Sequence, residues 1–200
     1  MVIIGWDVST AAIGVCVRRE GEPDQFSVIF PKGSTHLEKH RSAVKQVEAF
    51  LSEAIKPDEK VTHIVEERLG GFTGGFTSKQ TLMALAAMNA VVSHFLSHSG
   101  TVVHIPPITT KRITGLTLLD GEDKKQAVVR LARSSVPHFP YKETKFGNWA
   151  EGVDDMADAW LLTEAGSKVL RGEATLGSSK KAAGSKNKAR RAKGNRKTKK

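Results

Sequence analysis

The sequence predicts an α/β protein with a mixed five-stranded sheet flanked by helices. Two patterns predict this fold class. Over the first 30 residues, short apolar runs alternate with turns, which is typical of antiparallel strands joined as a meander. Further along the chain, helical patterns alternate with two more apolar runs, and a strand that returns to a sheet after a helix adds to it in parallel. The sheet is therefore predicted to hold three antiparallel strands and then parallel additions.

The three antiparallel strands are predicted at residues 2–8, 13–18 and 25–30. The first of them is apolar and rich in branched side chains, which suits a buried strand. Residues 9–12 are small and form the turn between the first two strands.

A helix is predicted over residues 36–54, because apolar residues recur there at helical spacing. Pro57 and Asp58 follow that helix, and residues 61–66 form the fourth strand. The residues expected to face the core from the helix are Leu37, Val44, Val47, Phe50 and Leu51.

A second long helix is predicted over residues 78–97, and the fifth strand at 101–105 ends at Pro106-Pro107. The remaining predicted elements are a short helix at 109–114, a helix at 124–134, an irregular loop at 137–149 and a final helix at 152–171.

The positive charge of the chain is concentrated at its end. The chain has 31 Lys and Arg, 21 Asp and Glu and a net charge of +10. Residues 177–200 hold 11 of the basic residues and no acidic one, which leaves 20 basic and 21 acidic residues, a net charge of −1, in residues 1–176. We predict a folded domain at 1–172 and a disordered Lys/Arg-rich tail at 173–200, which would attract nucleic acid.

The same composition argues against secretion and membrane insertion. Cys16 is the only cysteine, so no internal disulfide can form, and a reducing compartment is the simplest reading. No apolar run approaches the roughly 20 residues that span a membrane. We expect an intracellular, cytoplasmic protein of a bacterial or phage-infected cell.

Four acidic residues stand in otherwise apolar contexts. Asp7 interrupts the run at residues 2–8, and Glu66 ends the run at 61–66. Asp155 and Asp158 are three apart in the last helical pattern, so they share one helix face. Charged carboxylates beside strand cores are unfavourable unless a partner compensates them, and hard divalent cations take oxygen ligands. The four acids therefore indicate a carboxylate metal site of the kind used by Mg²⁺-dependent nucleases.

Each acid also has a plainer interpretation. Asp7 could cap the turn that follows it, and Glu66 could be solvated together with Glu67, although strand alternation lets only one of that pair face Asp7. Asp154, Asp155 and Asp158 could simply be acids favoured by a helix N-terminus. We expect Asp154 to point away from the pair.

In the order of these motifs, the sequence resembles the RuvC family of Holliday-junction resolvases, which have the RNase H-like fold. The resemblance covers roughly residues 1–170 and rests on acidic motifs, not on the sequence between them. The matching residues are Ile3-Ile4-Gly5-Trp6-Asp7 with Gly14, then Ile64-Val65-Glu66, then Asp155-Met156-Ala157-Asp158-Ala159.

The resemblance implies a homodimer that binds a four-way DNA junction and makes two symmetric nicks. Asp7, Glu66, Asp155 and Asp158 would be catalytic metal ligands for two Mg²⁺ ions, for which Mn²⁺ is expected to substitute. Ser9-Thr10 after the first acid, Trp6 before it and the basic tail depart from the family pattern. These departures favour a phage, viral or organellar branch of the family.

The resemblance also implies functional lysines after the fifth strand. Lys111 matches one, and the second is either Lys124 or Lys125, of which Lys125 is preferred. Their expected role is to hold the scissile phosphate and offset developing charge. Solvated helix lysines are the plainer alternative. Arg112, next to Lys111, is expected to contact DNA.

The glycine-rich segment at 70–75 would face the DNA, because the family places an aromatic wedge near this point. Phe72 is the preferred wedge, while Phe76 could equally be a core residue of the following helix. The helix at 78–97 carries small residues that would suit a dimer contact, although simple core packing explains them as well.

Three other functions remain open on the sequence. One is another RNase H-like nuclease that cuts RNA–DNA hybrids, pre-ribosomal RNA or other branched nucleic acid. A second is an actin-like ATPase or sugar kinase, for which 200 residues are too few to build a second lobe. The third is a non-catalytic DNA-binding protein using its basic tail, which leaves the four acids unexplained. The sequence does not identify the cleavage sequence or a helicase partner.

Overall fold

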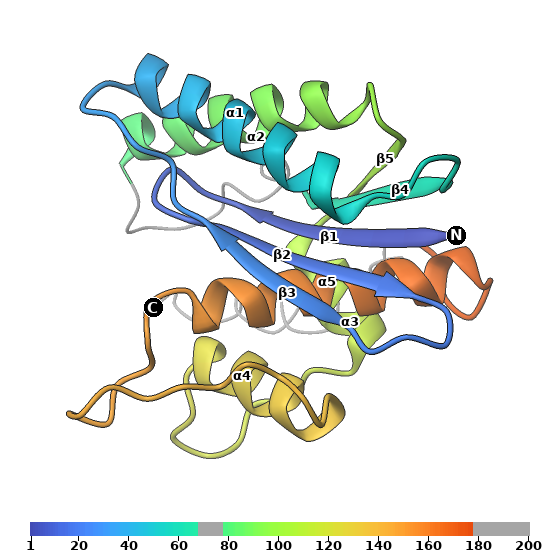
Figure 1. Ribbon diagram of the computed structural model, residues 1–200. Coiled ribbons are helices and arrows are strands. Elements are labelled where there is room, and N and C mark those ends of the chain that lie inside the picture. Colours follow the sequence, from blue (N-terminus) through green and yellow to red (C-terminus); the bar gives the residue numbers. More distant parts are fainter. Residues whose placement is uncertain (68–77, 178–200) are drawn as a thin grey trace, which may run out of the picture.

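In the computed structural model, residues 1–67 and 78–177 are described, and they build one mixed sheet between two helical layers (Figure 1). The strand order is β3-β2-β1-β4-β5. The first three strands pair antiparallel, and β4 and β5 add in parallel, as the sequence predicts. The strands are β1 (Val2–Val8), β2 (Ile13–Arg19), β3 (Gln25–Ile29), β4 (Val61–Glu66) and β5 (Thr101–Ile105).

The helices divide between the two faces of the sheet. Helices α1 and α2 cover one face, while α3, α4 and α5 lie on the other (Figure 1). The helices are α1 (His36–Ala54), α2 (Lys79–Leu96), α3 (Pro107–Thr114), α4 (Lys124–Ser135) and α5 (Val153–Leu170). Within the described residues, none of these helices combines the length and apolar character that crossing a membrane requires.

The side chains of β1 alternate between the two faces of the sheet and pack into a different hydrophobic core on each face. Val2, Ile4, Trp6 and Val8 join the core under α1 and α2. Ile3 instead packs with residues of β4, β5 and α5. Successive strand residues face opposite sides, so Asp7 shares the α5 face with Ile3.

Two glycines allow α5 to approach the sheet closely. A Cβ atom at Gly5 would lie 2.3 Å from the carbonyl oxygen of Ala159, and one at Gly14 would lie 2.0 Å from that of Asp155. Neither contact is possible for a side chain, so glycine at both positions sets the helix–sheet distance. Thr163 fastens the helix further, because its hydroxyl donates to the carbonyl of Cys16 at 3.2 Å.

Several predicted details are wrong in instructive ways. Leu37 is 58% exposed, and the buried residues of α1 begin only at Ala43. The short helix starts at Pro107, two residues earlier than predicted, since proline suits the first helical position. The segment at 137–149 is not wholly irregular, because Glu143 and Trp149 pair as an antiparallel bridge.

A polar chain crosses the core between β1, β4 and the end of α2. The Trp6 indole donates to Nδ1 of His63 at 3.1 Å, and Nε2 of His63 lies 3.1 Å from the Ser99 hydroxyl. His63 is fully buried, and desolvation lowers its pKa to about 4. The imidazole is therefore neutral in the folded protein at neutral pH, and its unprotonated Nδ1 accepts the hydrogen bond from the indole N–H.

This neutral histidine predicts a specific acid sensitivity. Unfolding restores the ordinary pKa near 6.5, so the unfolded chain binds an extra proton between about pH 6.5 and 4. The stability that His63 contributes is complete above that window and falls by on the order of 2–3 kcal/mol as the pH drops through it. Denaturant unfolding of the wild-type protein and His63→Gln should show the difference between them shrinking from pH 7 to pH 4. A constant difference would contradict this account.

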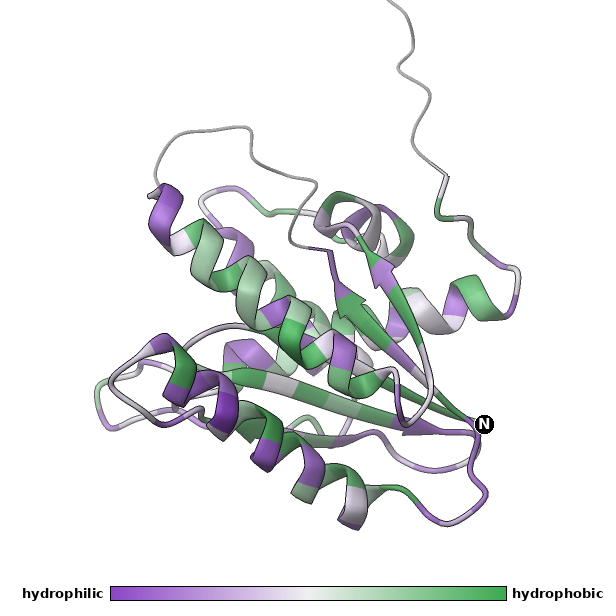
Figure 2. Cartoon of the chain, turned by 90° about the horizontal axis from the view of Figure 1, so that it is seen from above, coloured by the Kyte–Doolittle hydropathy of each residue, from purple (hydrophilic) through white to green (hydrophobic). Residues whose placement is uncertain are grey.

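On the side seen in Figure 2, helix α2 is mostly apolar after its first turn, whereas polar and apolar residues alternate along α1. The buried residues of α2, among them Met88, Val92 and Leu96, lie in its second half. In the first half, Met83 is 73% exposed. The helix thus has more apolar surface than the sheet covers in the described part of the chain.

Candidate active site

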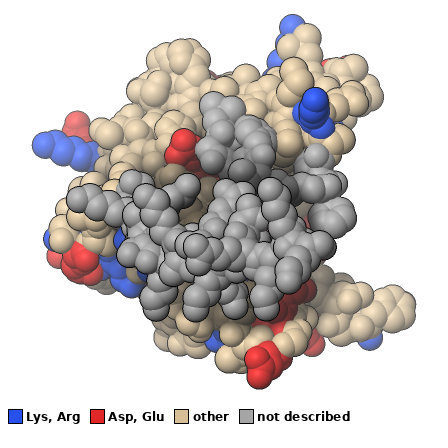
Figure 3. Space-filling view, turned by 180° about the vertical axis from the view of Figure 1, so that it is seen from behind, with Lys and Arg blue, Asp and Glu red and all other residues tan. Residues whose placement is uncertain are grey.

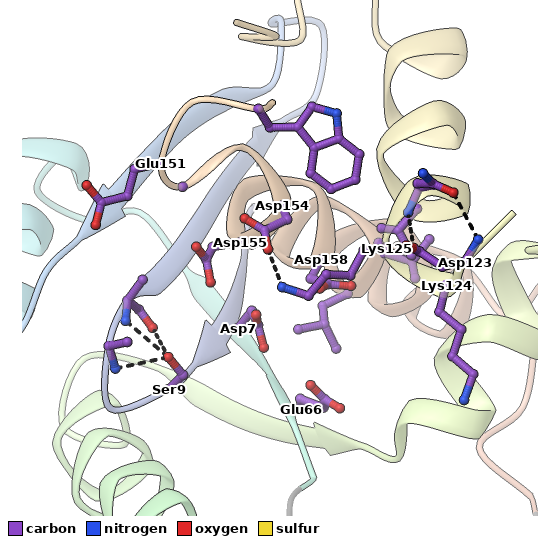
Figure 4. Close-up of a pocket in the computed structure, with 18 of the residues that line it drawn as sticks. Asp7, Ser9, Glu66, Asp123, Lys124, Lys125, Glu151, Asp154, Asp155 and Asp158 are labelled. Atoms are coloured by element: carbon purple, nitrogen blue, oxygen red, sulfur yellow. Dashed lines mark hydrogen bonds and ion pairs between the residues drawn. The ribbon is translucent and has the colours of Figure 1, made fainter. Parts of the chain in front are cut away.

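One cavity of about 990 Å³ opens over the α5 side of the sheet, where β1 and β4 end. Figure 4 shows the four predicted acids gathered around it, although they come from three separate elements. The lining includes Asp7, Glu66, Asp155 and Asp158 together with Lys111, Lys124 and Lys125. Charges of both signs thus face one space.

Strand alternation brings Asp7 and Glu66 to this face. In the parallel pairing, Trp6 lies opposite Val65, so the next residues along, Asp7 and Glu66, lie side by side near the ends of their strands. The end of β4 is fixed, because the Asn89 amide donates to the carbonyl of Glu66 at 3.0 Å. Glu67 is not among the described residues that line the cavity, so the alternation favours Glu66.

The turn after Asp7 has its own cap. The backbone N–H groups of Ala11 and Ala12 donate to the Ser9 hydroxyl at 3.2 and 3.0 Å. These bonds weaken the plainer interpretation in which Asp7 caps the turn, because the Ser9 hydroxyl already accepts hydrogen bonds from the turn's N–H groups.

The first two turns of α5 supply the other acids. Gly152 precedes the helix at φ +88°, and a Cβ there would lie 2.7 Å from Val28, so a side chain is excluded on two counts. Asp155 and Asp158 then project from one face of the helix into the cavity. The expectation that Asp154 points away is wrong, because it lines the same cavity.

Asp154 pairs with Lys125 across the cavity wall. The ammonium donates to the carboxylate, and this bond raises the pKa of Lys125. The charge on the lysine is therefore retained, with Asp155 and Asp158 adding to its attraction. Sequence reasoning missed this pairing because only the packing of α4 against α5 brings residues 29 apart into contact.

The deeper acids have too little positive charge nearby to offset their burial. Desolvation raises the pKa of Asp158, and the carboxylate of Asp7 raises it further, against the opposing effect of Lys111. Desolvation also raises the pKa of Asp155, with Asp154 as the second cause. A divalent cation bound beside these carboxylates would lower the pKa of both.

The donor set fits a hard divalent cation in its chemistry, since all four candidate ligands are carboxylates. Their surplus negative charge fits it as well. In the side-chain positions of residues 1–67 and 78–177, no three His, Cys, Asp or Glu residues form a group close enough to hold a metal ion. The carboxylates border a common space and would need to rotate toward a bound ion.

The predicted basic residues occupy different places. Lys111 on α3 and both candidates on α4, Lys124 and Lys125, line the cavity. Arg112 instead donates to the backbone carbonyls of Thr175 and Gly177 at 2.9 and 3.4 Å, so it holds the segment after α5 against α3. Phe72 and Phe76 lie outside the described residues.

The described surface does not carry one continuous basic region on the face seen in Figure 3. Lysine, arginine and acidic side chains stand there in small separate groups. This distribution agrees with the near-neutral charge of residues 1–176.

The raised pKa of Asp158 predicts that this residue lowers stability when no cation is bound. The folded state holds the proton more tightly than the unfolded state, so stability falls as the pH rises above the ordinary carboxyl range. In the presence of EDTA, Asp158→Asn should exceed the wild-type protein in stability by about 0.5–2 kcal/mol at pH 8 and by less at pH 5. Thermal unfolding at both pH values measures this. An equal gain at both would refute the cause given.

The strand order and the two helical layers are those of the RNase H-like α/β fold. The solved structures that share this fold include two of RuvC. They are RuvC of T. thermophilus in complex with a Holliday junction substrate, with a TM-score of 0.58, and a Thermus thermophilus RuvC structure, with a TM-score of 0.55. Both are 14% identical, and the matches cover 86% of this chain and 96% and 97% of theirs. No protein-family model matches the chain, and no curated protein does.

Proposed function

We propose that this protein is a structure-selective DNA endonuclease that resolves four-way junctions by paired symmetric nicks. The observation that carries the proposal is the cavity where four carboxylates from β1, β4 and α5 face lysines from α3 and α4. The fold shared with RuvC supports it, since one of those structures holds a Holliday junction substrate.

The residues divide the chemistry between them. Asp7, Glu66, Asp155 and Asp158 would hold Mg²⁺, which when bound lowers the pKa of water and neutralises charge on a phosphate. Lys111 opposes the charge of Asp158 and would bind a non-bridging phosphate oxygen. Lys125, held by Asp154, would orient the strand beside it.

A dimer is part of the proposal, because two symmetric nicks require two sites. Helix α2 supports this, since its first half leaves apolar side chains such as Met83 exposed. A two-fold contact through this helix would cover them with the same surface of a second copy. The basic tail would add sequence-independent phosphate contacts and a steep salt dependence.

The test is cleavage of a synthetic mobile four-way junction with Mg²⁺, with the products mapped on all four strands. The proposal predicts nicks at symmetric positions in two strands of like polarity. An RNA–DNA hybrid and a single strand of the same sequence are the matched substrates. Much faster cutting of the hybrid would replace the junction-resolving activity with that of a hybrid-cutting nuclease, and no cutting of any substrate with Mg²⁺ or Mn²⁺ would remove the catalytic role.

A further inference from the structure

Residues 142–150, between α4 and α5, form a small hairpin beside the cavity. Its ends are joined by a bond from the N–H of Ala150 to the carbonyl of Lys142 at 2.8 Å, and its middle by one from Thr144 to Asn148 at 2.7 Å. Gly147 closes the turn at φ +76°, a conformation that other residues rarely adopt. The hairpin is therefore a defined element with a fixed tip.

Phe146 stands at that tip with 78% of its surface exposed. The Lys145 ammonium lies over its ring, 4.9 Å from the ring centroid. Lys145 and Lys142 are exposed as well. The tip thus offers an aromatic face with positive charge beside it, which is the combination that proteins use to stack nucleic-acid bases.

The base of the hairpin is anchored in the protein. The guanidinium of Arg133 lies 3.6 Å from the centroid of the Tyr141 ring, and the Tyr141 hydroxyl donates to Glu143. Just before them, the buried Phe139 packs edge-on against Phe26 of β3, with centroids 5.2 Å apart. These contacts fix the direction in which the tip projects.

The hairpin also borders the site of the proposed reaction. Gly147, Asn148 and Trp149 line the same cavity as the four acids and the lysines. Trp149 lines a second cavity of about 470 Å³ on α4 as well, together with Arg130 and Arg133. A strand with its phosphate at the carboxylates would therefore pass next to the hairpin.

We infer that the hairpin at 142–150 contacts DNA and that Phe146 stacks on a base exposed at the branch, next to the cleaved phosphate. Lys142 and Lys145 bind the flanking phosphates. This inference rests on the proposed function and adds a contact separate from Phe72, because it comes from a different connection of the chain. An aromatic ring exposed to water lacks the favourable free energy of burying its apolar surface, and a base stacked on the ring would supply that burial.

Binding of a four-way junction labelled with 2-aminopurine at the branch tests the inference, using the full chain with Asp7→Asn to prevent cutting. Phe146→Ala should bind the junction about 5- to 150-fold more weakly, the range that 1–3 kcal/mol for one stacked base corresponds to. It should also lose the change in 2-aminopurine fluorescence that accompanies binding, whereas Phe146→Trp should retain both the affinity and the fluorescence change. Leu37→Ala, another exposed apolar residue, is the matched control on the opposite helical layer.

The outcomes separate the two proposals. If the parent protein binds the junction and Phe146→Ala matches it in affinity and signal, the role of the hairpin is overturned and the proposed function stands. If the parent protein binds no branched DNA, both are overturned. The thermal unfolding midpoint of Phe146→Ala should equal that of the parent, because the ring is exposed.

Discussion

Replacement of Asp7 by Asn is expected to lower the rate of junction cleavage by about a thousand-fold or more. The change removes one negative charge from the group of carboxylates, and the Asn side chain has nearly the same size as that of Asp. The proposed function makes Asp7 a metal ligand, and loss of such a ligand removes several kcal/mol of transition-state stabilisation, where each 1.36 kcal/mol is tenfold in rate. Affinity for the junction should be equal or higher, because one charge that repels phosphate is gone. Single-turnover cleavage and filter binding measure the two effects separately.

The matched pair for this prediction is Glu66→Gln and Glu67→Gln. Both make the same chemical change at adjacent residues, but only Glu66 lines the cavity. Glu66→Gln should lose activity as Asp7→Asn does, whereas Glu67→Gln should cleave at the wild-type rate. Loss of activity in Glu67→Gln alone would mean that the strand presents the other carboxylate.

Replacement of Gly14 by Ala is expected to destabilise the fold by about 3 kcal/mol, equivalent to about 6–12 °C in the unfolding midpoint. The added Cβ would lie 2.0 Å from the carbonyl oxygen of Asp155, which belongs to the backbone of α5 and cannot rotate away. The helix must move off β2, and it carries Asp155 and Asp158 with it. Cleavage should therefore fall even at temperatures where the variant remains folded.

Gly177→Ala is the control for that substitution, since a Cβ there meets its nearest atom at 3.8 Å, an ordinary contact. It should leave both the midpoint and the cleavage rate unchanged. A folded Gly14→Ala variant with wild-type stability and activity would show that α5 tolerates the shift and that the close approach has no role in placing the acids.

The fold could be predicted from the sequence because its signals are local. Runs such as residues 2–8 and 61–66 are apolar and short, and their order around two long helices leaves few sheet topologies. Leu37 shows where this reasoning fails. Its spacing fits the core face of α1, but the buried residues begin only at Ala43. Helical spacing predicts which face is apolar, whereas the part of that face that is covered depends on the elements packed against it.

The candidate site was predicted in part. Asp7, Glu66, Asp155 and Asp158 were identifiable because each is an acid in an apolar context, and strand alternation showed that only one of Glu66 and Glu67 could face Asp7. Asp154 was expected to point away from the site, and Arg112 was expected to contact DNA without any contact inside the protein. Asp154 meets Lys125, and Arg112 meets the carbonyl of Thr175, 63 residues away, so neither contact has a signal in the neighbouring sequence.

The sequence by itself determined which residue types are present at which strand and helix positions, and hence the class of fold and the acids that could form a site. Tertiary structure alone decided which of them share a space. Gly5 and Gly14 let α5 approach the sheet until Asp155 and Asp158 border the same cavity as Asp7. Packing of α4 on α5 then set Lys125 against Asp154. Alternation and helical period are properties of single elements, whereas the distance between elements follows from how their side chains fit together.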